Sequence, residues 1–202
     1  MNFIKFYTTF KKKTIFSFQE IFFMYPSFDK RRLFERKKKW FIQSIRKWWY
    51  MFSDKKPTEK DLFIIANKIN KPSYISCESA LYYYNLIPEW VFLTTSVTTK
   101  KTVQYTTDIW TFRYQKTKNT LFFWFKIIAW YKIAYKEKAV LDFLYLKPHI
   151  KTQKDMIGLR IDRDEFLDWF NKKRWNNYLK QFNQKELTKR ANLLLTLLKN
   201  DV

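Results

Sequence analysis

Glycine is almost absent from this chain, since Gly158 is the single glycine in 202 residues. Average usage of about 7% would give roughly fourteen. Glycine takes positive φ at no steric cost, so tight turns and helix ends normally use it. Tryptophan, usually the rarest residue, occurs nine times. The turns of this protein must therefore be made by residues that carry side chains.

The chain has a formal net charge of +22, and this charge is unevenly distributed. Residues 1–60 hold 16 Lys and Arg against 5 Asp and Glu. Such a charge favours a polyanionic partner, either nucleic acid or an anionic membrane surface. The hydrophobic fraction of 47% argues against disorder. The bias toward Lys, Ile, Asn and Phe is typical of an A/T-rich genome, which accounts for part of the basicity.

The first 55 residues predict three short helices followed by a β-hairpin. Apolar spacing indicates a helix over 2–12, a capping-box pattern begins a second at Ser17, and the third is the basic stretch 30–39. Two β-like runs, 41–45 and 49–52, follow it. This order is typical of a winged helix-turn-helix, in which the third helix enters the major groove and the hairpin, or wing, touches the DNA backbone.

A polar, proline-containing linker at 53–59 separates the expected domains, 1–55 and 56–202. Threonine, β-branched and aromatic residues dominate 91–134, which predicts an antiparallel sheet of four or five strands. We therefore expect an α+β protein, with an N-terminal winged helix-turn-helix followed by a mixed α/β domain that ends in helices. The helices expected in the second domain are 60–70, 77–86, 137–146 and two or three beyond Arg163.

No residue pattern is typical of a catalytic or cofactor site. His149 is the single histidine and Cys77 the single cysteine, so neither a His-based metal site nor an internal disulfide is expected. Glu137 and Asp142 lie five residues apart rather than on one helix face, and the acidic residues around Asp164 suit a helix N-terminus. We therefore expect a protein that is not an enzyme and that uses no metal or cofactor.

No signal peptide or membrane-spanning segment is expected either. Lysines at 5 and 11–13 interrupt the apolar N-terminal residues. The best apolar run, 121–131, is shorter than the roughly 18 residues of a membrane span and contains Lys126. A lone cysteine fits a reducing compartment, so we expect a cytoplasmic protein without membrane contact.

Several blocks of sequence, in the right order, resemble the AbiEi-type antitoxin family. The resemblance covers about residues 14–150, while the last fifty residues match only in helical character. The blocks are FDKRRLFERKKKWFIQSIRKWWYMFSD (28–54), IANKINKPSYIS (65–76), YISCESALYYYNLIPEWV (74–91), TSVTTKK (95–101) and IAYKEKAVLDFLYL (133–146).

The resemblance implies a protein with two functions in a bacterial toxin–antitoxin system of phage defence. Its N-terminal domain would bind duplex DNA at its own promoter, at inverted repeats, and repress its own operon. Its second domain would act as the antitoxin against a nucleotidyltransferase-like toxin. In this class of system a stable complex between toxin and antitoxin is not required.

The basic third helix and the hairpin carry the candidate DNA contacts, because cationic side chains suit phosphates and guanine edges. Arg31, Arg32 and Glu35 are the candidates for base edges. Arg46 and Lys47, at the wing tip, are the candidates for phosphates. The full set is Lys30, Arg31, Arg32, Glu35, Arg36, Lys37, Lys38, Arg46 and Lys47. In the second domain the candidates for a functional surface are Thr98, Thr99, Lys100 and Lys101.

Three other interpretations compete with DNA binding. In the first, the basic stretch 30–39 is simply a solvent-exposed helix of an organism whose proteins are rich in lysine. Charge and aromatic content by themselves favour an RNA- or ribosome-associated protein without catalytic activity. Lysine together with Trp and Phe also suits the surface of a membrane. The order of helix and hairpin at 28–53 favours duplex DNA over the first two. The membrane interpretation weakens if the tryptophans stand for glycine.

Several tryptophans stand where glycine is expected. Trp40 follows the third helix, Trp48 lies in the hairpin turn, and Trp110 lies between two expected strands. The resembling family has glycine at these sites, and also at those of Trp124 and Trp130. Random substitution would not concentrate on one residue type. We therefore hypothesise that these codons are UGA, which the source cell reads as glycine; the alternative is a divergent protein rich in tryptophan.

Overall fold

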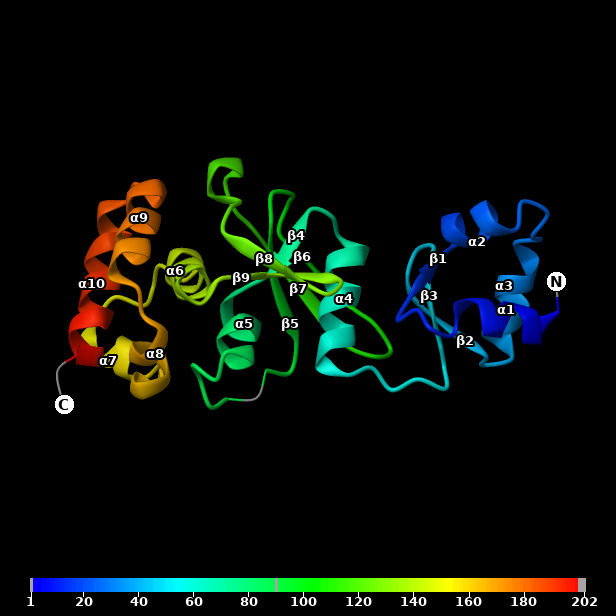
Figure 1. The fold of residues 1–202 in the computed structure, drawn as a ribbon, viewed down its shortest axis with the longest axis horizontal. Helices are drawn as coiled ribbons and strands as arrows, with labels where there is room; N and C mark the ends of the chain where they lie inside the picture. Colours follow the sequence, from blue (N-terminus) through cyan, green and yellow to red (C-terminus); the bar gives the residue numbers. More distant parts are fainter. Residues whose placement is uncertain (1, 90, 200–202) are drawn as a thin grey trace.

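Residues 2–52 form a unit of three helices and a small antiparallel sheet, at the right of Figure 1. The computed structural model describes residues 2–89 and 91–199. The sheet has the strand order β1-β3-β2. The elements of this unit are α1 (Phe3–Phe10), β1 (Phe16–Ser17), α2 (Phe18–Met24), α3 (Arg31–Lys38), β2 (Ile42–Arg46) and β3 (Trp49–Phe52).

The core of this N-terminal unit is mostly aromatic. Phe6, Phe10 and Phe16 are fully buried, and the ring of Phe6 contacts the rings of Phe16 and Phe52 edge-on at 5.4 and 5.7 Å. Such edge-to-face pairs add to the stabilisation that burial of their area gives. The core is separate from the larger one that fills the rest of the molecule, except that residues of the small sheet's other face join the larger core.

The local predictions for this unit are confirmed. Ser17 and Glu20 form a reciprocal capping box at the start of α2, with the Ser17 amide donating to the Glu20 carboxylate at 2.7 Å. The predicted hairpin is present as β2 and β3, whose register shifts between Ser44 and Arg46. Such an irregularity bends a strand and increases its twist.

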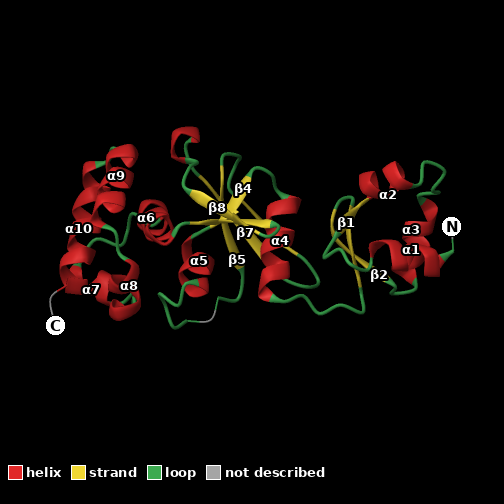
Figure 2. Cartoon of the chain, viewed as in Figure 1, coloured by secondary structure: helices red, strands yellow, loops and turns green. Residues whose placement is uncertain are grey.

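The remaining residues build a six-stranded sheet with helices on its faces and a helical C-terminal part (Figures 1 and 2). The elements up to the last strand are α4 (Glu59–Ile69), β4 (Ser73–Ile75), α5 (Cys77–Tyr83), β5 (Thr94–Thr98), β6 (Val103–Thr106), β7 (Thr111–Lys116), η1 (Asn119–Leu121), β8 (Phe125–Ile128) and β9 (Tyr131–Ala134). The helices that follow are α6 (Lys136–Leu146), α7 (Gln153–Ile157), α8 (Arg163–Trp169), α9 (Lys172–Phe182) and α10 (Lys185–Lys199).

The prediction of a purely antiparallel sheet is wrong. The sequence predicts four or five strands in 91–134 and five are present there, but β4 enters the sheet between β5 and β9. The strand order is β6-β7-β5-β4-β9-β8. β4 pairs with β9 in parallel, and β5 pairs with β7 in parallel. β4 has three residues, too few for an alternating pattern to reveal it.

The sheet is the central layer of the molecule. Helices α4 and α5 pack against it, and α6 connects it to α9 and α10. Ile75, Val97 and Ile133, from three different strands, are fully buried beneath these helices. The acidic residues near Asp164 do form a helix start, because the Asp162 carboxylate accepts the Glu165 amide at 2.8 Å and caps α8.

Three tryptophans have the backbone conformation that normally requires glycine. Trp40, Trp48 and Trp124 have φ of 56°, 70° and 54°. A bulky residue in this left-handed region is strained. Trp110 and Trp130 do not share this conformation; in the hairpin between β8 and β9 the positive φ, 50°, belongs to Ala129. The prediction of positive φ is thus confirmed for Trp40 and Trp48 and is wrong for Trp110.

Candidate nucleic-acid interface

Helix α3 turns two side chains toward the core. Leu33 and Arg36 are buried, and they lie three residues apart on the same helix face. The Arg36 guanidinium lies over the rings of Phe6 and Phe28, at 4.0 and 5.3 Å from their centroids. Burial lowers the pKa of Arg36. The expectation that Arg36 contacts DNA is therefore corrected, because its side chain supports the aromatic core instead.

The other candidate residues of α3 are exposed. Arg31, Glu35 and Lys38 lie at spacings of three and four, directly opposite the buried face, while Arg32 and Lys37 flank them. Asp29 accepts the amide of Arg31 at 2.9 Å and its Nε at 3.0 Å. The backbone hydrogen bond from Arg31 lowers the pKa of Asp29. Asp29 therefore fixes the first turn of the helix and orients Arg31.

The start of α3 and the tip of the hairpin lie side by side. The ammonium of Lys30 lies 4.0 Å from the ring centroid of Trp48, and Phe18 contacts the same indole at 5.5 Å between centroids. Lys47, at the tip, is exposed. The Lys47 ammonium lies 5.8 Å from the same Trp48 ring centroid, so Lys30 and Lys47 lie close to one another at this end of α3.

Arg46 faces the second part of the chain. Its guanidinium donates to the carbonyl of Ile69 at the end of α4 and lies over the ring of Tyr105, 4.1 Å from the centroid. The half-buried Arg46 side chain thus joins the hairpin to α4 and β6, and its contact with a phosphate stays a prediction. Patterns in short stretches of sequence do not reveal this contact, because both partners of Arg46 lie far from it along the chain.

The block TSVTTKK is divided between the interior and the surface. Thr98 is fully buried, and its hydroxyl donates to the Pro72 carbonyl at 2.7 Å, so it is not part of a functional surface. Thr99 is half-buried, and Lys100 and Lys101 are exposed in the turn after β5. Of the four candidates, Lys100 and Lys101 have the charge and exposure of a binding surface.

The carboxylates singled out in α6 have separate structural partners. Asp142 is fully buried, and its Oδ2 accepts the hydroxyls of Tyr74 and Ser76 at 2.9 and 2.8 Å. Glu137, also fully buried, accepts Arg174 Nη1 at 3.1 Å. The two carboxylates therefore do not form a pair that faces a substrate.

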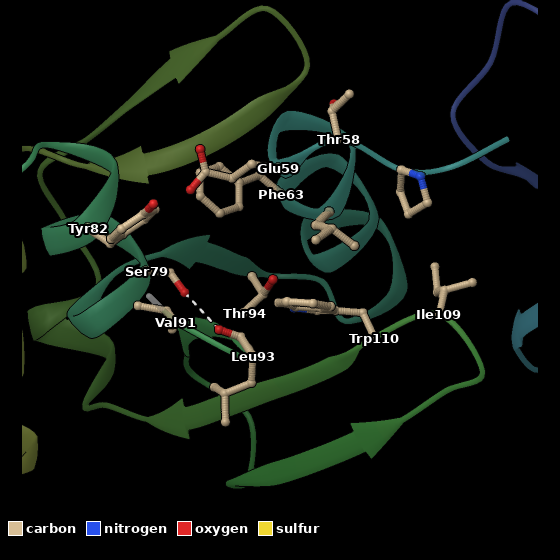
Figure 3. Close-up of a pocket in the computed structure, with 12 residues that line it drawn as sticks. Thr58, Glu59, Phe63, Ser79, Tyr82, Val91, Leu93, Thr94, Ile109 and Trp110 are labelled. Atoms are coloured by element: carbon tan, nitrogen blue, oxygen red, sulfur yellow. Dashed lines mark hydrogen bonds between the residues drawn. The ribbon is translucent and has the colours of Figure 1, made fainter. Parts of the chain in front are cut away.

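A pocket of about 440 Å³ lies between the start of α4, α5 and the loop before β7 (Figure 3). Its walls are mostly apolar, and Phe63, Leu93 and Trp110 line it. Glu59 lies at its rim, and burial raises the pKa of that carboxyl. The Ser79 hydroxyl donates to the Leu93 carbonyl at 3.2 Å. Sequence patterns did not indicate this pocket, because its lining comes from four separate segments.

The lone cysteine and the lone histidine have no partners of the kind that a metal site needs. Cys77 is buried, and burial raises the pKa of its thiol; His149 is exposed after α6. Across residues 2–89 and 91–199, no group of three His, Cys, Asp or Glu side chains is placed to hold a metal ion. In the same residues no helix has the length and apolarity to cross a bilayer.

Comparison with known proteins gives no match to any family model or to any curated protein. The functional argument therefore depends on the arrangement of α3, the hairpin and their charges.

Proposed function

We propose that residues 2–52 form a winged helix that binds duplex DNA. One observation carries the proposal: α3 exposes Arg31, Glu35 and Lys38, and the start of this helix lies beside the tip of a hairpin that bears Lys47. The order helix, strand, helix, helix, strand, strand supports it, since a winged helix places its third helix in the major groove and its hairpin on the backbone.

We propose further that the protein is an autorepressor and the antitoxin of a bacterial toxin–antitoxin system. The resemblance of blocks 28–54, 74–91 and 133–146 to AbiEi-type antitoxins supports this, as does the strongly basic character of the chain. Residues 56–202 would then oppose a nucleotidyltransferase-like toxin without forming a stable complex. A neighbouring frame that encodes such a toxin, whose growth arrest this chain relieves, would support the proposal. A toxin that arrests growth equally with and without this chain would contradict it.

Duplex DNA from the protein's own promoter is expected to bind more tightly than a scrambled duplex of equal length. Binding should weaken steeply with salt, since each neutralised phosphate contributes about −0.9 to the slope of log affinity against log salt. Fluorescence anisotropy with labelled duplexes at several salt concentrations measures both. Equal affinity for the two duplexes at every salt concentration would contradict repression, and tighter binding to RNA would favour an RNA-binding function.

Arg31→Ala is expected to reduce sequence discrimination, whereas Lys47→Ala is expected to reduce affinity for all duplexes. If Arg31 contacts a guanine with two hydrogen bonds, its loss reduces discrimination between promoter and scrambled DNA by about 1–3 kcal/mol. Loss of Lys47 weakens both duplexes alike and makes the salt slope shallower by about one phosphate contact. Arg32→Ala should behave like Arg31→Ala. Identical behaviour of the arginine and lysine variants would show that base and phosphate roles are assigned wrongly.

A further inference from the structure

One apolar side chain stands among the cations on the exposed face of α3. Phe34 is 72% exposed, although the other apolar residue of this helix, Leu33, is buried. Phe34 follows Arg31 by three residues and precedes Lys38 by four, so the ring lies on the same face as both. The face proposed to enter the major groove therefore has an aromatic ring beside its cations.

The Phe34 ring does not contribute to the core of the N-terminal unit. The aromatic core beneath α3 consists of Phe6, Phe10, Phe16 and neighbouring residues, and Phe34 belongs neither to it nor to the partly buried residues packed against it. The apolar area of this exposed ring stays hydrated, and covering it would be favourable in free energy. A partner that offers apolar area within a polyanionic surface would bury it.

Duplex DNA offers apolar area of this kind in the major groove. The C5-methyl group of thymine distinguishes T·A from the other base pairs there by an apolar contact. Neighbouring arginine and lysine side chains supply contacts to guanine edges and phosphates.

We propose that Phe34 is a specificity-determining residue that contacts a thymine methyl group in the major groove. This inference rests on the proposed function, because it requires α3 to lie in that groove. Because Phe34 lies about one helical turn after Arg31, the thymine is expected close to the base that Arg31 contacts.

The test removes the methyl groups without changing any hydrogen bond. Binding of the full chain is measured by anisotropy to its own promoter duplex and to the same duplex with deoxyuridine in place of every thymidine. The wild-type chain should bind the deoxyuridine duplex about fourfold more weakly for each methyl group that it contacts. Phe34→Ala should bind both duplexes equally, while Phe34→Leu should retain part of the difference. Arg31→Ala is the matched control: it should bind more weakly but keep the preference for thymine.

Three outcomes would overturn the inference, and they are distinguishable. A wild-type chain that binds no duplex DNA removes the proposed function as well. A wild-type chain that binds the promoter but does not distinguish the two duplexes leaves DNA binding intact and removes the role of Phe34. The same holds if Phe34→Ala keeps the full preference for thymine. Circular dichroism of the variant controls for folding, which truncation of an exposed ring should leave unchanged.

Discussion

Replacing Asp142 by alanine is expected to destabilise the protein by about 3–5 kcal/mol, because the change leaves a fully buried ammonium without its counter-charge. Lys138 and Asp142 form an ion pair one turn apart on α6, and both side chains are inaccessible to solvent. Lys138 also donates to the Tyr74 hydroxyl at 2.9 Å, and that hydroxyl donates to Asp142 at 2.9 Å. Urea unfolding followed by circular dichroism measures the loss.

The network joins elements that are far apart in the sequence. Tyr74 belongs to the central strand β4, and the Lys138 ammonium lies 5.0 Å from the ring centroid of Phe182 at the end of α9. Burial next to Asp142 raises the pKa of Tyr74 well above its usual value, so its hydroxyl stays protonated and remains a donor. The Asp142→Ala substitution should therefore weaken the packing of both the sheet and the C-terminal helices, and so lower the free energy of unfolding of the whole molecule.

Two controls separate charge imbalance from lost packing. The double variant Lys138→Met with Asp142→Leu removes both charges and should recover most of the loss, as buried ion pairs replaced by apolar residues often do. Asp168→Ala, at an exposed site on α8, should change stability by less than about 0.5 kcal/mol. A double variant as unstable as Asp142→Ala would show that the uncompensated ammonium is not the cause.

Local patterns predicted much of this fold because helix caps and apolar spacing act over a few residues. The three N-terminal helices, the capping box at Ser17 and the hairpin all follow from short stretches of sequence. The sheet order does not, because β4 takes its central place through pairing with strands about twenty and sixty residues away.

The candidate site shows the same division. The exposure of Arg31 and Glu35 follows from the helical period, and the burial of Arg36 was predictable in the same way, since it lies three residues after Leu33. The contact of Arg46 with Ile69 and Tyr105 was not predictable, because it depends on how the hairpin packs against α4 and β6.

Replacing Trp40, Trp48 and Trp124 together by glycine is expected to stabilise the protein by several kcal/mol, at about 1–3 kcal/mol for each site less any packing lost. Each residue has positive φ, a conformation that costs a bulky residue about 1–3 kcal/mol and glycine almost nothing. Trp40→Gly should gain most, because this side chain is 79% exposed and has little packing to lose. Trp124→Gly should gain less, since its indole donates to Gln181 at 3.1 Å and contacts Tyr178.

Trp130 and Trp110 are the matched controls, because neither has positive φ. Trp130 is 80% exposed, so Trp130→Gly loses little packing but gains no relief of strain, and should be neutral or slightly destabilising. Trp110 packs against the large core, so Trp110→Gly should destabilise. Thermal unfolding of the single variants compares them directly. A gain at Trp130 equal to that at Trp40 would show that removal of an exposed indole, and not backbone strain, is responsible.

The same three positions test whether glycine is the residue made in the source cell. Recoding of UGA explains why bulky residues recur at backbone positions that suit glycine, whereas a divergent protein would have to tolerate the strain at each one. The hypothesis predicts UGA codons at Trp40, Trp48 and Trp124, where the backbone itself supports glycine. At Trp110 and Trp130 it depends on the family resemblance alone. UGG codons at the first three positions would refute recoding. In that case, the gain in the free energy of unfolding of Trp40→Gly would measure the backbone strain that Trp40 causes in the natural protein.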